Sequence, residues 1–162
     1  MSSPLSSPSP AKPVIALPVL VSVRRNRTER RITVPELMTG LMEDGFIIQD
    51  DHDRVMKDWR TSGSDAHPLV VLANAKIKSQ KPPHRTLDIE KLTEWTAGRV
   101  EIPYFHIDPL KIDMRAVTEV MSSDYASRRN ILPVEARGRD VVIATCEPYL
   151  SAWQRELGDM LK

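Results

Sequence analysis

The sequence predicts an α+β fold: an N-terminal helical hairpin, a linker, and then helices packed on a small sheet that contains an antiparallel hairpin. Three observations predict it. Apolar residues recur at helical spacing in several separate segments. Two strand-like runs, residues 131–136 and 140–145, flank an Arg-Gly-Arg turn, which is the pattern of a β-hairpin. Apolar residues make up 41% of the 162 residues and aromatic residues only 5%, so we expect a core built mainly from aliphatic side chains.

Composition divides the chain into four segments. Residues 1–13 are mostly Ser, Pro and Ala and are predicted to be a disordered leader, because they cannot bury enough apolar surface to offset the cost of ordering. Residues 14–62 hold an apolar arm and the helical hairpin, residues 63–86 form a polar and basic linker, and residues 87–162 form an α/β subdomain. The apolar pattern is still running at the last residue, which predicts that this subdomain is truncated there.

The helical hairpin begins after Thr33. Thr33 followed by Glu36 has the form of a capping box, and Gly45 suits the left-handed residue that ends a helix. A second helix is predicted over about residues 50–60. Two short helices need a further surface to pack against.

The elements of the middle of the chain are less regular. Residues 69–73 are apolar and fit either a strand or a helical turn, and the pattern leaves both open. A third helix is predicted over residues 89–97, with Asp88 as its cap and Gly98 as its stop. Residues 104–107 are predicted to form a short strand.

The last elements surround the β-hairpin. Asp113 is placed to cap a fourth helix and Ser123 a short fifth one that ends at Asn130. Pro148 is expected to open a final helix whose apolar face holds Tyr149, Trp153, Leu157, Met160 and Leu161.

No segment carries a catalytic or metal-binding pattern. Gly40 and Gly45 have the glycine spacing of a phosphate loop, but Phe46 follows where that loop needs Lys. No two of the four His are spaced to grip a metal from one helix, and the single Cys146 has no identifiable base. We therefore predict no catalytic residue, no metal site, no cofactor and no enzymatic activity.

Charge argues against a nucleic-acid partner. The chain has 23 basic and 22 acidic residues, a formal net charge of +1, whereas nucleic-acid-binding domains are distinctly basic. The arginine-rich segment 24–31 does not outweigh this balance. No run of 18 apolar residues is present, so a membrane-spanning helix is not predicted either.

Short motifs follow one another in a fixed order: residues 67–71 (HPLVV), 92–95 (LTEW), 104–113 (YFHIDPLKID), 128–134 (RRNILPV), 141–145 (VVIAT) and 147–148 (EP). This order resembles the N-terminal domain of bacterial type II secretion and type IV pilus assembly ATPases of the GspE, PulE and PilB types, which is related to the MshE N-terminal domain. The resemblance covers about residues 33–162.

The resemblance implies a non-catalytic docking and regulatory domain that works in protein transport ahead of an ATPase domain. The expected partners are an inner-membrane platform protein and the downstream ATPase domain. The expected location is the cytoplasm, peripheral to the inner membrane through these partners. Whether the machine is a secretion system or a pilus stays open.

In some members of this family the domain binds cyclic di-GMP through an Arg-Leu-Gly motif followed by a second Gly. Aligning Gly45 with that second Gly places Leu37 on the motif's Leu, but it also places Glu36 where the Arg belongs. A carboxylate reverses the charge that faces a phosphate. Arg30 and Arg31 are the candidate substitutes, so Arg30, Arg31, Leu37 and Gly45 are the candidate site for an anionic ligand or nucleotide.

Overall fold

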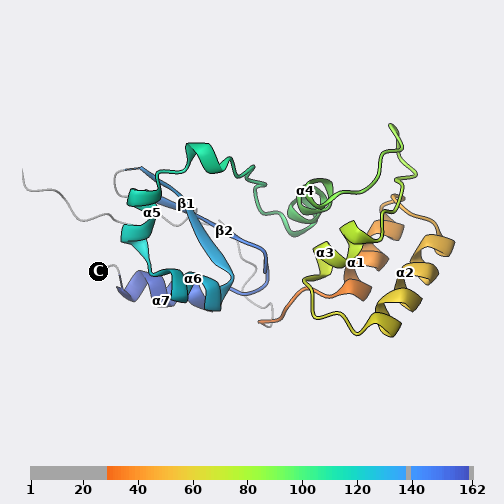
Figure 1. The fold of residues 1–162 in the computed structure, drawn as a ribbon, viewed down its shortest axis with the longest axis horizontal. Helices are drawn as coiled ribbons and strands as arrows, with labels where there is room; N and C mark the ends of the chain where they lie inside the picture. The colour runs from red at the N-terminus through yellow and green to blue at the C-terminus, as the bar shows by residue number, and fades with distance from the viewer. Residues whose placement is uncertain (1–28, 138–139, 161–162) are drawn as a thin grey trace, which may run out of the picture. The chain divides into compact units, whose positions relative to one another are not determined.

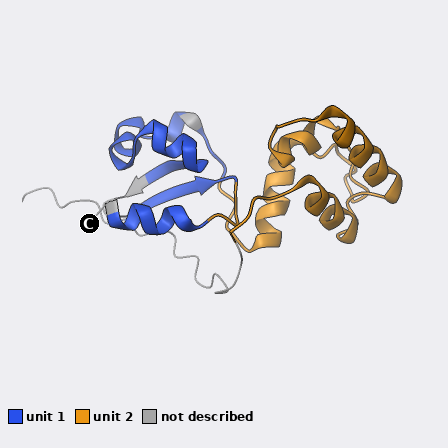
Figure 2. Ribbon diagram, turned by 90° about the horizontal axis from the view of Figure 1, so that it is seen from below, with its two compact units in different colours: residues 1–26, 106–146, 151–162 blue, residues 27–105, 147–150 orange. Residues whose placement is uncertain are grey.

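The structure, a computed structural model, describes residues 29–137 and 140–160. Within them it contains seven α-helices, one short 3-10 helix and a two-stranded antiparallel sheet, which confirms the predicted α+β class. None of the helices described reaches the length and apolarity of a membrane-spanning segment. The elements group into two compact units (Figure 2). The predicted disordered leader, residues 1–13, lies outside the described residues.

Unit 2 comprises residues 27–105 and 147–150 and is built from four helices (Figure 1). α1 packs against α2 and α3, and α3 packs against α4. α1 and α2 are the predicted helical hairpin, and α3 and α4 supply the surface that it needs. The four helices are α1 (Val34–Glu43), α2 (Gln49–Ser62), α3 (Pro68–Asn74) and α4 (Ile89–Val100). The core of unit 2 holds Ile32, Val34, Leu37, Met38, Leu41, Ile47, Val55, Met56, Leu69, Leu72, Ile77, Leu87 and Leu92.

The helix ends of unit 2 follow local signals in part. Thr33 caps α1 as predicted, with its hydroxyl oxygen 3.4 Å from the backbone nitrogen of Glu36, whose N–H it accepts. α2 is longer than predicted at both ends. α4 runs through Gly98, where we expected it to stop, and ends at Glu101 in the left-handed conformation (φ 60°). A glycine weakens a helix without ending it, and the N–H of Glu101 still donates to the carbonyl of Gly98 at 3.4 Å.

The segment predicted as a linker, residues 63–86, contains helix α3. Residues 69–73, whose pattern fits either a strand or a helical turn, lie in this helix. Pro68 occupies the first turn, where a missing N–H is harmless. The Nδ1 atom of His67 accepts the N–H of Leu69 at 3.3 Å and caps the helix. α3 adds two buried side chains, Leu69 and Leu72, to the core of unit 2.

A folded loop follows α3, and we call residues 76–85 the basic loop. Lys78 and Thr86 form an antiparallel bridge that closes it. Ile77 and Leu87, at its two ends, are 1% and 2% exposed and pack in the core of unit 2. The loop is therefore attached to the helical unit at both ends.

Unit 1, among the described residues, comprises 106–137, 140–146 and 151–160. Its strands pair antiparallel as predicted, from Ile131 opposite Thr145 to Arg137 opposite Asp140, so Arg137, which the sequence predicts in the turn, is the last residue of β1. α5 and α6 pack against β1. The elements are η1 (Pro109–Lys111), α5 (Met114–Val120), α6 (Ser123–Arg129), β1 (Ile131–Arg137), β2 (Asp140–Thr145) and α7 (Ala152–Met160). Their core holds Val120, Met121, Ile131, Val141, Ile143, Trp153 and Leu157.

Two local predictions here are wrong. Residues 104–107 form no strand, because an extended apolar run needs a pairing partner and the described sheet consists of β1 and β2 alone. α6 is capped by Ser122 and not by Ser123, since the Ser122 hydroxyl accepts the N–H of Tyr125 at 3.3 Å. Asp113 caps α5 as predicted.

The final helix also begins later than predicted. α7 starts at Ala152, four residues after Pro148. Residues 147–150, which we call the 147–150 loop, belong to unit 2, although the segments on both sides belong to unit 1. Tyr149, expected on the apolar face of the last helix, instead lies in this loop and packs against the core of unit 2.

Candidate functional site

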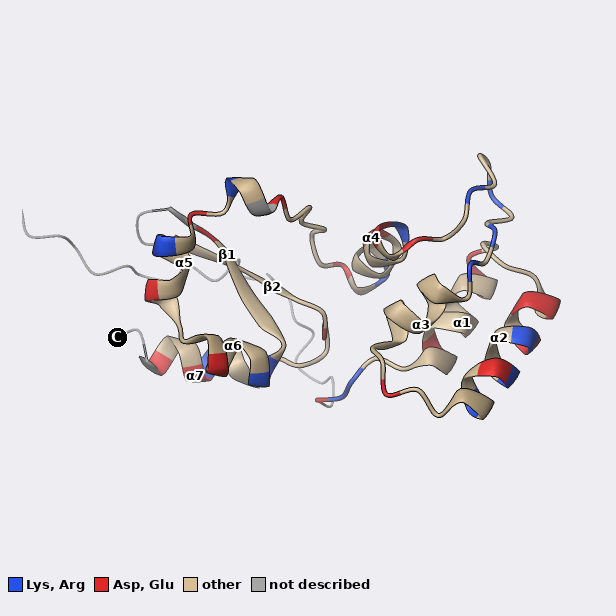
Figure 3. Ribbon diagram, viewed as in Figure 1, with Lys and Arg blue, Asp and Glu red and all other residues tan. Residues whose placement is uncertain are grey.

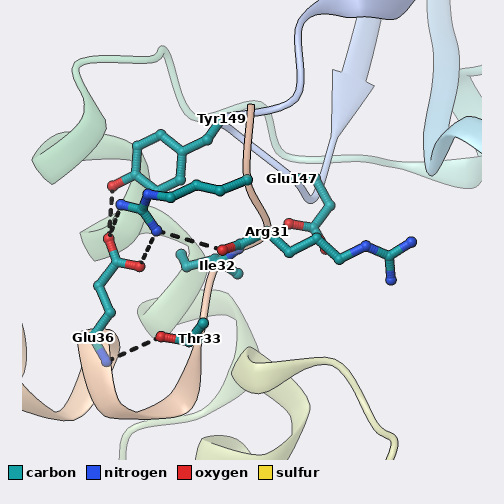
Figure 4. Close-up of polar contacts among 7 residues, drawn as sticks. Arg31, Ile32, Thr33, Glu36, Glu147 and Tyr149 are labelled. Carbon is teal, nitrogen blue, oxygen red and sulfur yellow. Dashed lines mark hydrogen bonds and ion pairs between the residues drawn. The ribbon is translucent and has the colours of Figure 1, made fainter. Parts of the chain in front are cut away.

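A cluster of polar side chains joins the start of α1 to the 147–150 loop within unit 2 (Figure 4). The Arg30 guanidinium makes a two-pronged ion pair with the Glu36 carboxylate, at 2.6 and 2.7 Å. The Tyr149 hydroxyl donates to the same carboxylate at 3.0 Å, and the guanidinium lies 4.0 Å from the centroid of the Tyr149 ring. We call Arg30, Glu36 and Tyr149 the Arg30 cluster. It fixes the chain before α1 by contacts with a residue more than a hundred positions away.

Within the Arg30 cluster, the charges of Arg30 and Glu36 neutralise each other. The hydrogen bond from Arg30, and next the one from Tyr149, lower the pKa of the Glu36 carboxyl, and partial burial opposes them. The hydrogen bond to Glu36 raises the pKa of Arg30. Because Glu36 turns toward Arg30, it does not complete the predicted capping box, and only the Thr33 arm is made.

This arrangement makes a prediction for pH dependence. Because the folded-state pKa of Glu36 lies below its ordinary value of 4.5, the pair stabilises unit 2 fully above that value and loses the contribution as the pH falls through the lowered pKa. Arg30→Gln removes the cation, so its stability deficit relative to wild type is expected at neutral pH and to shrink in acid. Urea denaturation at pH values on both sides of the transition measures this difference. A deficit that stays constant with pH would contradict the ion pair.

A second contact secures the 147–150 loop. Glu147 is 3% exposed, and its Oε2 atom accepts the N–H of Ile32 at 3.1 Å. The Nε2 atom of His67 is 3.9 Å from Oε1 of the same carboxylate. Since Nδ1 of His67 accepts a backbone N–H, the proton of the neutral ring lies on Nε2, facing Glu147. A buried carboxylate thus receives a backbone donor and faces an imidazole N–H.

The structure separates the four predicted site residues. Arg30 and Arg31 precede α1, and Arg30 is engaged by Glu36, while Arg31 is exposed. Leu37 is 3% exposed and lies in the core of unit 2. Gly45 follows the other end of α1, in the left-handed conformation (φ 70°). A helix of 10 residues is about 15 Å long, and the two arginines and Gly45 lie at its opposite ends.

The structure instead brings an unpredicted cation to Gly45. A side chain at this glycine would lie 3.9 Å from Cε of Lys81, and Nζ of Lys81 lies 4.4 Å from the centroid of the Phe46 ring. The signal for Lys81 was present in the sequence as the basic run of residues 76–85, which we interpreted as a linker. Glu147 and Tyr149 had no such signal, because their partners are distant in the chain.

An open pocket of about 330 Å³ lies at the surface of unit 2. Its lining is mostly apolar, with Trp59, Pro35 and Pro68 among the contributing residues and Asp65 as the charged one. In the part of the chain that the structure describes, no group of three metal-ligating side chains occurs in this pocket or elsewhere. The pocket presents mainly apolar surface.

Unit 1 exposes large apolar side chains in one short segment. Ile107, Leu110 and Met114 are 39%, 95% and 63% exposed. Charged residues alternate with them, so apolar and ionic groups share the surface of this segment. We call residues 107–114 the apolar segment.

Comparison with known proteins locates two similarities. Residues 100–162 match the family model of the MshEN domain, a range that includes the apolar segment and the described residues of unit 1 beyond it. Over 118 residues the chain is 33% identical to the type IV pilus assembly ATPase TfpB of Acinetobacter baylyi. The aligned part is 72% of this chain but 20% of that relative, so the chain spans about a fifth of the relative's length.

Proposed function

We propose that this chain, which carries an MshEN domain at residues 100–162 and is similar to a type IV pilus assembly ATPase, is the N-terminal docking and regulatory domain of such an ATPase. The resemblance predicted from the sequence is confirmed by these two matches. The finer proposal is that the domain binds an inner-membrane platform protein of a pilus or secretion machine. Its place is then the cytoplasmic face of the inner membrane, held there by its partner. Hydrolysis of ATP belongs, in this proposal, to a separate ATPase domain.

The observation that carries the docking proposal is the apolar segment. Leu110 is 95% exposed, and it lies four residues before the 63%-exposed Met114. The exposure of large apolar side chains to water is unfavourable. A partner that covers them therefore gains free energy from their burial. Lys111 and Asp113 lie between these two residues, and a mixture of an apolar centre with a charged rim is typical of protein interfaces that form and separate.

We expect the purified chain to bind the cytoplasmic domain of its platform protein and Leu110→Asp/Met114→Asp to weaken that binding at least tenfold. The substitutions place charges where apolar contacts form, and both side chains are exposed, so folding is unaffected. Isothermal titration calorimetry measures the dissociation constants.

The matched control is Val70→Asp/Ile89→Asp, which changes two exposed apolar residues of unit 2, 40% and 46% exposed. Binding by the control variant should equal that of wild type. No binding by the wild-type chain at high micromolar concentration, or equal weakening by both variants, contradicts the docking surface.

Cyclic di-GMP binding is the second candidate function, and the observation that favours it is Lys81 beside Gly45. Against it, Arg30 is already paired and Leu37 is buried. The same calorimeter decides between the two candidates. Heat on adding cyclic di-GMP that disappears in Lys81→Ala would favour a nucleotide sensor, and no heat at hundreds of micromolar would remove this candidate.

A further inference from the structure

The basic loop of unit 2 gathers positive charge on one short stretch of backbone. It carries four cationic side chains and one imidazole, and no acidic residue occurs from Lys76 to Leu87. All five side chains are exposed, and Figure 3 shows the Lys and Arg positions along the loop that precedes α4. The five residues are Lys76, Lys78, Lys81, His84 and Arg85.

The loop is held in one shape by its own hydrogen bonds. The N–H of Ser79 donates to the carbonyl of Arg85 at 2.9 Å, and the N–H of Leu87 donates to the carbonyl of Ile77 at 2.8 Å. Ser79 is 8% exposed, and its hydroxyl oxygen accepts the N–H of Lys81 at 3.0 Å. A loop that is already ordered loses little conformational entropy when it binds a partner, and this favours association.

The Lys and Arg charges of the loop are not neutralised by ion pairs within the described residues. No ion pair within the described residues involves Lys76, Lys78 or Arg85. Among the other described cations of unit 2, Arg30, Arg54, Lys91 and Arg99 each contact a carboxylate, whereas Arg31, Lys57 and Arg60 do not. Lys76, Lys78 and Arg85 therefore present positive charge that no carboxylate of the described residues neutralises.

Apolar side chains accompany these cations. Pro82 and Pro83 are exposed within the loop, and the N–H of Gln80 donates to the carbonyl of Phe46 at 2.8 Å. This bond attaches the loop to the segment that ends in Ile48, which is 49% exposed. An anionic lipid surface binds cations that stand beside exposed apolar side chains. The headgroups attract the positive charges, and the membrane interface accommodates the apolar atoms.

Other polyanions fit the loop less well. Single-stranded nucleic acid needs exposed aromatic rings on which bases stack, and the basic loop has none. A small phosphorylated ligand enclosed in the open pocket of unit 2 would not meet the loop, because none of the loop's residues lines that pocket. A flat bilayer surface requires neither.

We propose that the basic loop binds the anionic headgroup surface of a lipid bilayer and holds unit 2 against it. The identity of that bilayer as the inner membrane rests on the proposed function, whereas lipid binding itself does not. Each cation near such a surface changes affinity by about fivefold. Reversal of three charges is therefore expected to weaken binding by at least about a hundredfold.

The experiment measures co-sedimentation of the full chain with vesicles that contain phosphatidylglycerol and with vesicles of phosphatidylcholine alone. Wild type should bind only the anionic vesicles and less at high salt. Lys76→Glu/Lys78→Glu/Arg85→Glu should abolish this binding. The control Lys57→Glu/Arg60→Glu/Lys91→Glu alters net charge by the same amount at exposed positions of α2 and α4 and should keep most of it.

Several results would overturn the proposal. Equal binding to both kinds of vesicle, or equal loss in the loop and control variants, would remove the loop as the lipid site. Loss of binding in Arg24→Glu/Arg25→Glu/Arg27→Glu with full binding by the loop variant would assign the lipid contact to that segment instead. Binding of single-stranded RNA as tight as that of anionic vesicles would show a general polyanion site. No arm contains the platform protein, so lipid binding and platform docking can fail independently.

Discussion

Glu147→Ala is expected to lower the free energy of unfolding of unit 2 by about 3 kcal/mol. The carboxylate is 3% exposed and accepts the N–H of Ile32, so its removal leaves a buried donor without a partner. The substitution also leaves a cavity where the side chain was. The Nε2 atom of His67, which is buried without a hydrogen-bond partner among the described residues, loses the carboxylate that lies 3.9 Å away as well.

The measurement is urea denaturation followed by tryptophan fluorescence in a Trp153→Phe background. The chain has three tryptophans, and the two that remain, Trp59 and Trp95, both lie in unit 2. Glu147→Gln is the matched control, because its amide oxygen still accepts the N–H of Ile32, and it should lose less than half as much stability. An alanine variant as stable as the glutamine variant would show that the hydrogen bond contributes nothing.

Gly40→Val is expected to destabilise unit 2 by about 2–3 kcal/mol. Gly40 is buried in α1, and a Cβ atom there would lie 3.1 Å from the Arg99 guanidinium and 3.1 Å from the Trp95 ring. The guanidinium moves easily, but the ring is held by its N–H, which donates to Asp44 at 2.8 Å. A β-branched side chain therefore separates α1 from α4.

The same helix pair offers the control for this substitution. Gly98 lies in α4 and has no atom within 4 Å of the position of a Cβ. Gly98→Val should therefore change the free energy of unfolding by less than about 0.5 kcal/mol, since only helix propensity differs. Equal destabilisation by the two variants would show that a valine in a helix, and not the contact with Trp95, causes the loss.

The Arg99 contacts show why this glycine is required. Arg99 pairs with Asp44 at 3.0 Å and with Glu43 at 2.9 Å, both at the end of α1. The hydrogen bonds from Trp95 and then Arg99 lower the pKa of the Asp44 carboxyl. The side chains of Arg99 and Trp95 pass over residue 40 to make these contacts, and a side chain at that position would meet them. The sequence shows the glycine spacing of Gly40 and Gly45 but not this reason for it.

Taken by itself, the sequence determined what depends on neighbouring residues. Thr33, Asp88 and Asp113 were recognisable as helix caps because a side-chain oxygen reaches a backbone N–H only two or three positions away. The β-hairpin followed from two strand-like runs and a short turn between them. The order of motifs also indicated the family resemblance, because motifs can be compared along the chain without knowing which residues are in contact.

Only the tertiary structure decided which distant residues meet. Tyr149 and Glu36 are 113 positions apart, and Glu147 and Ile32 are 115 apart, so no local periodicity relates them. These contacts keep the 147–150 loop out of the final helix. The surroundings of each candidate residue also came from the tertiary structure. It shows that Leu37 is buried, that Arg30 is paired with Glu36 and that the basic loop is exposed. Helix caps act within one turn of backbone, whereas burial and pairing depend on the whole packed unit.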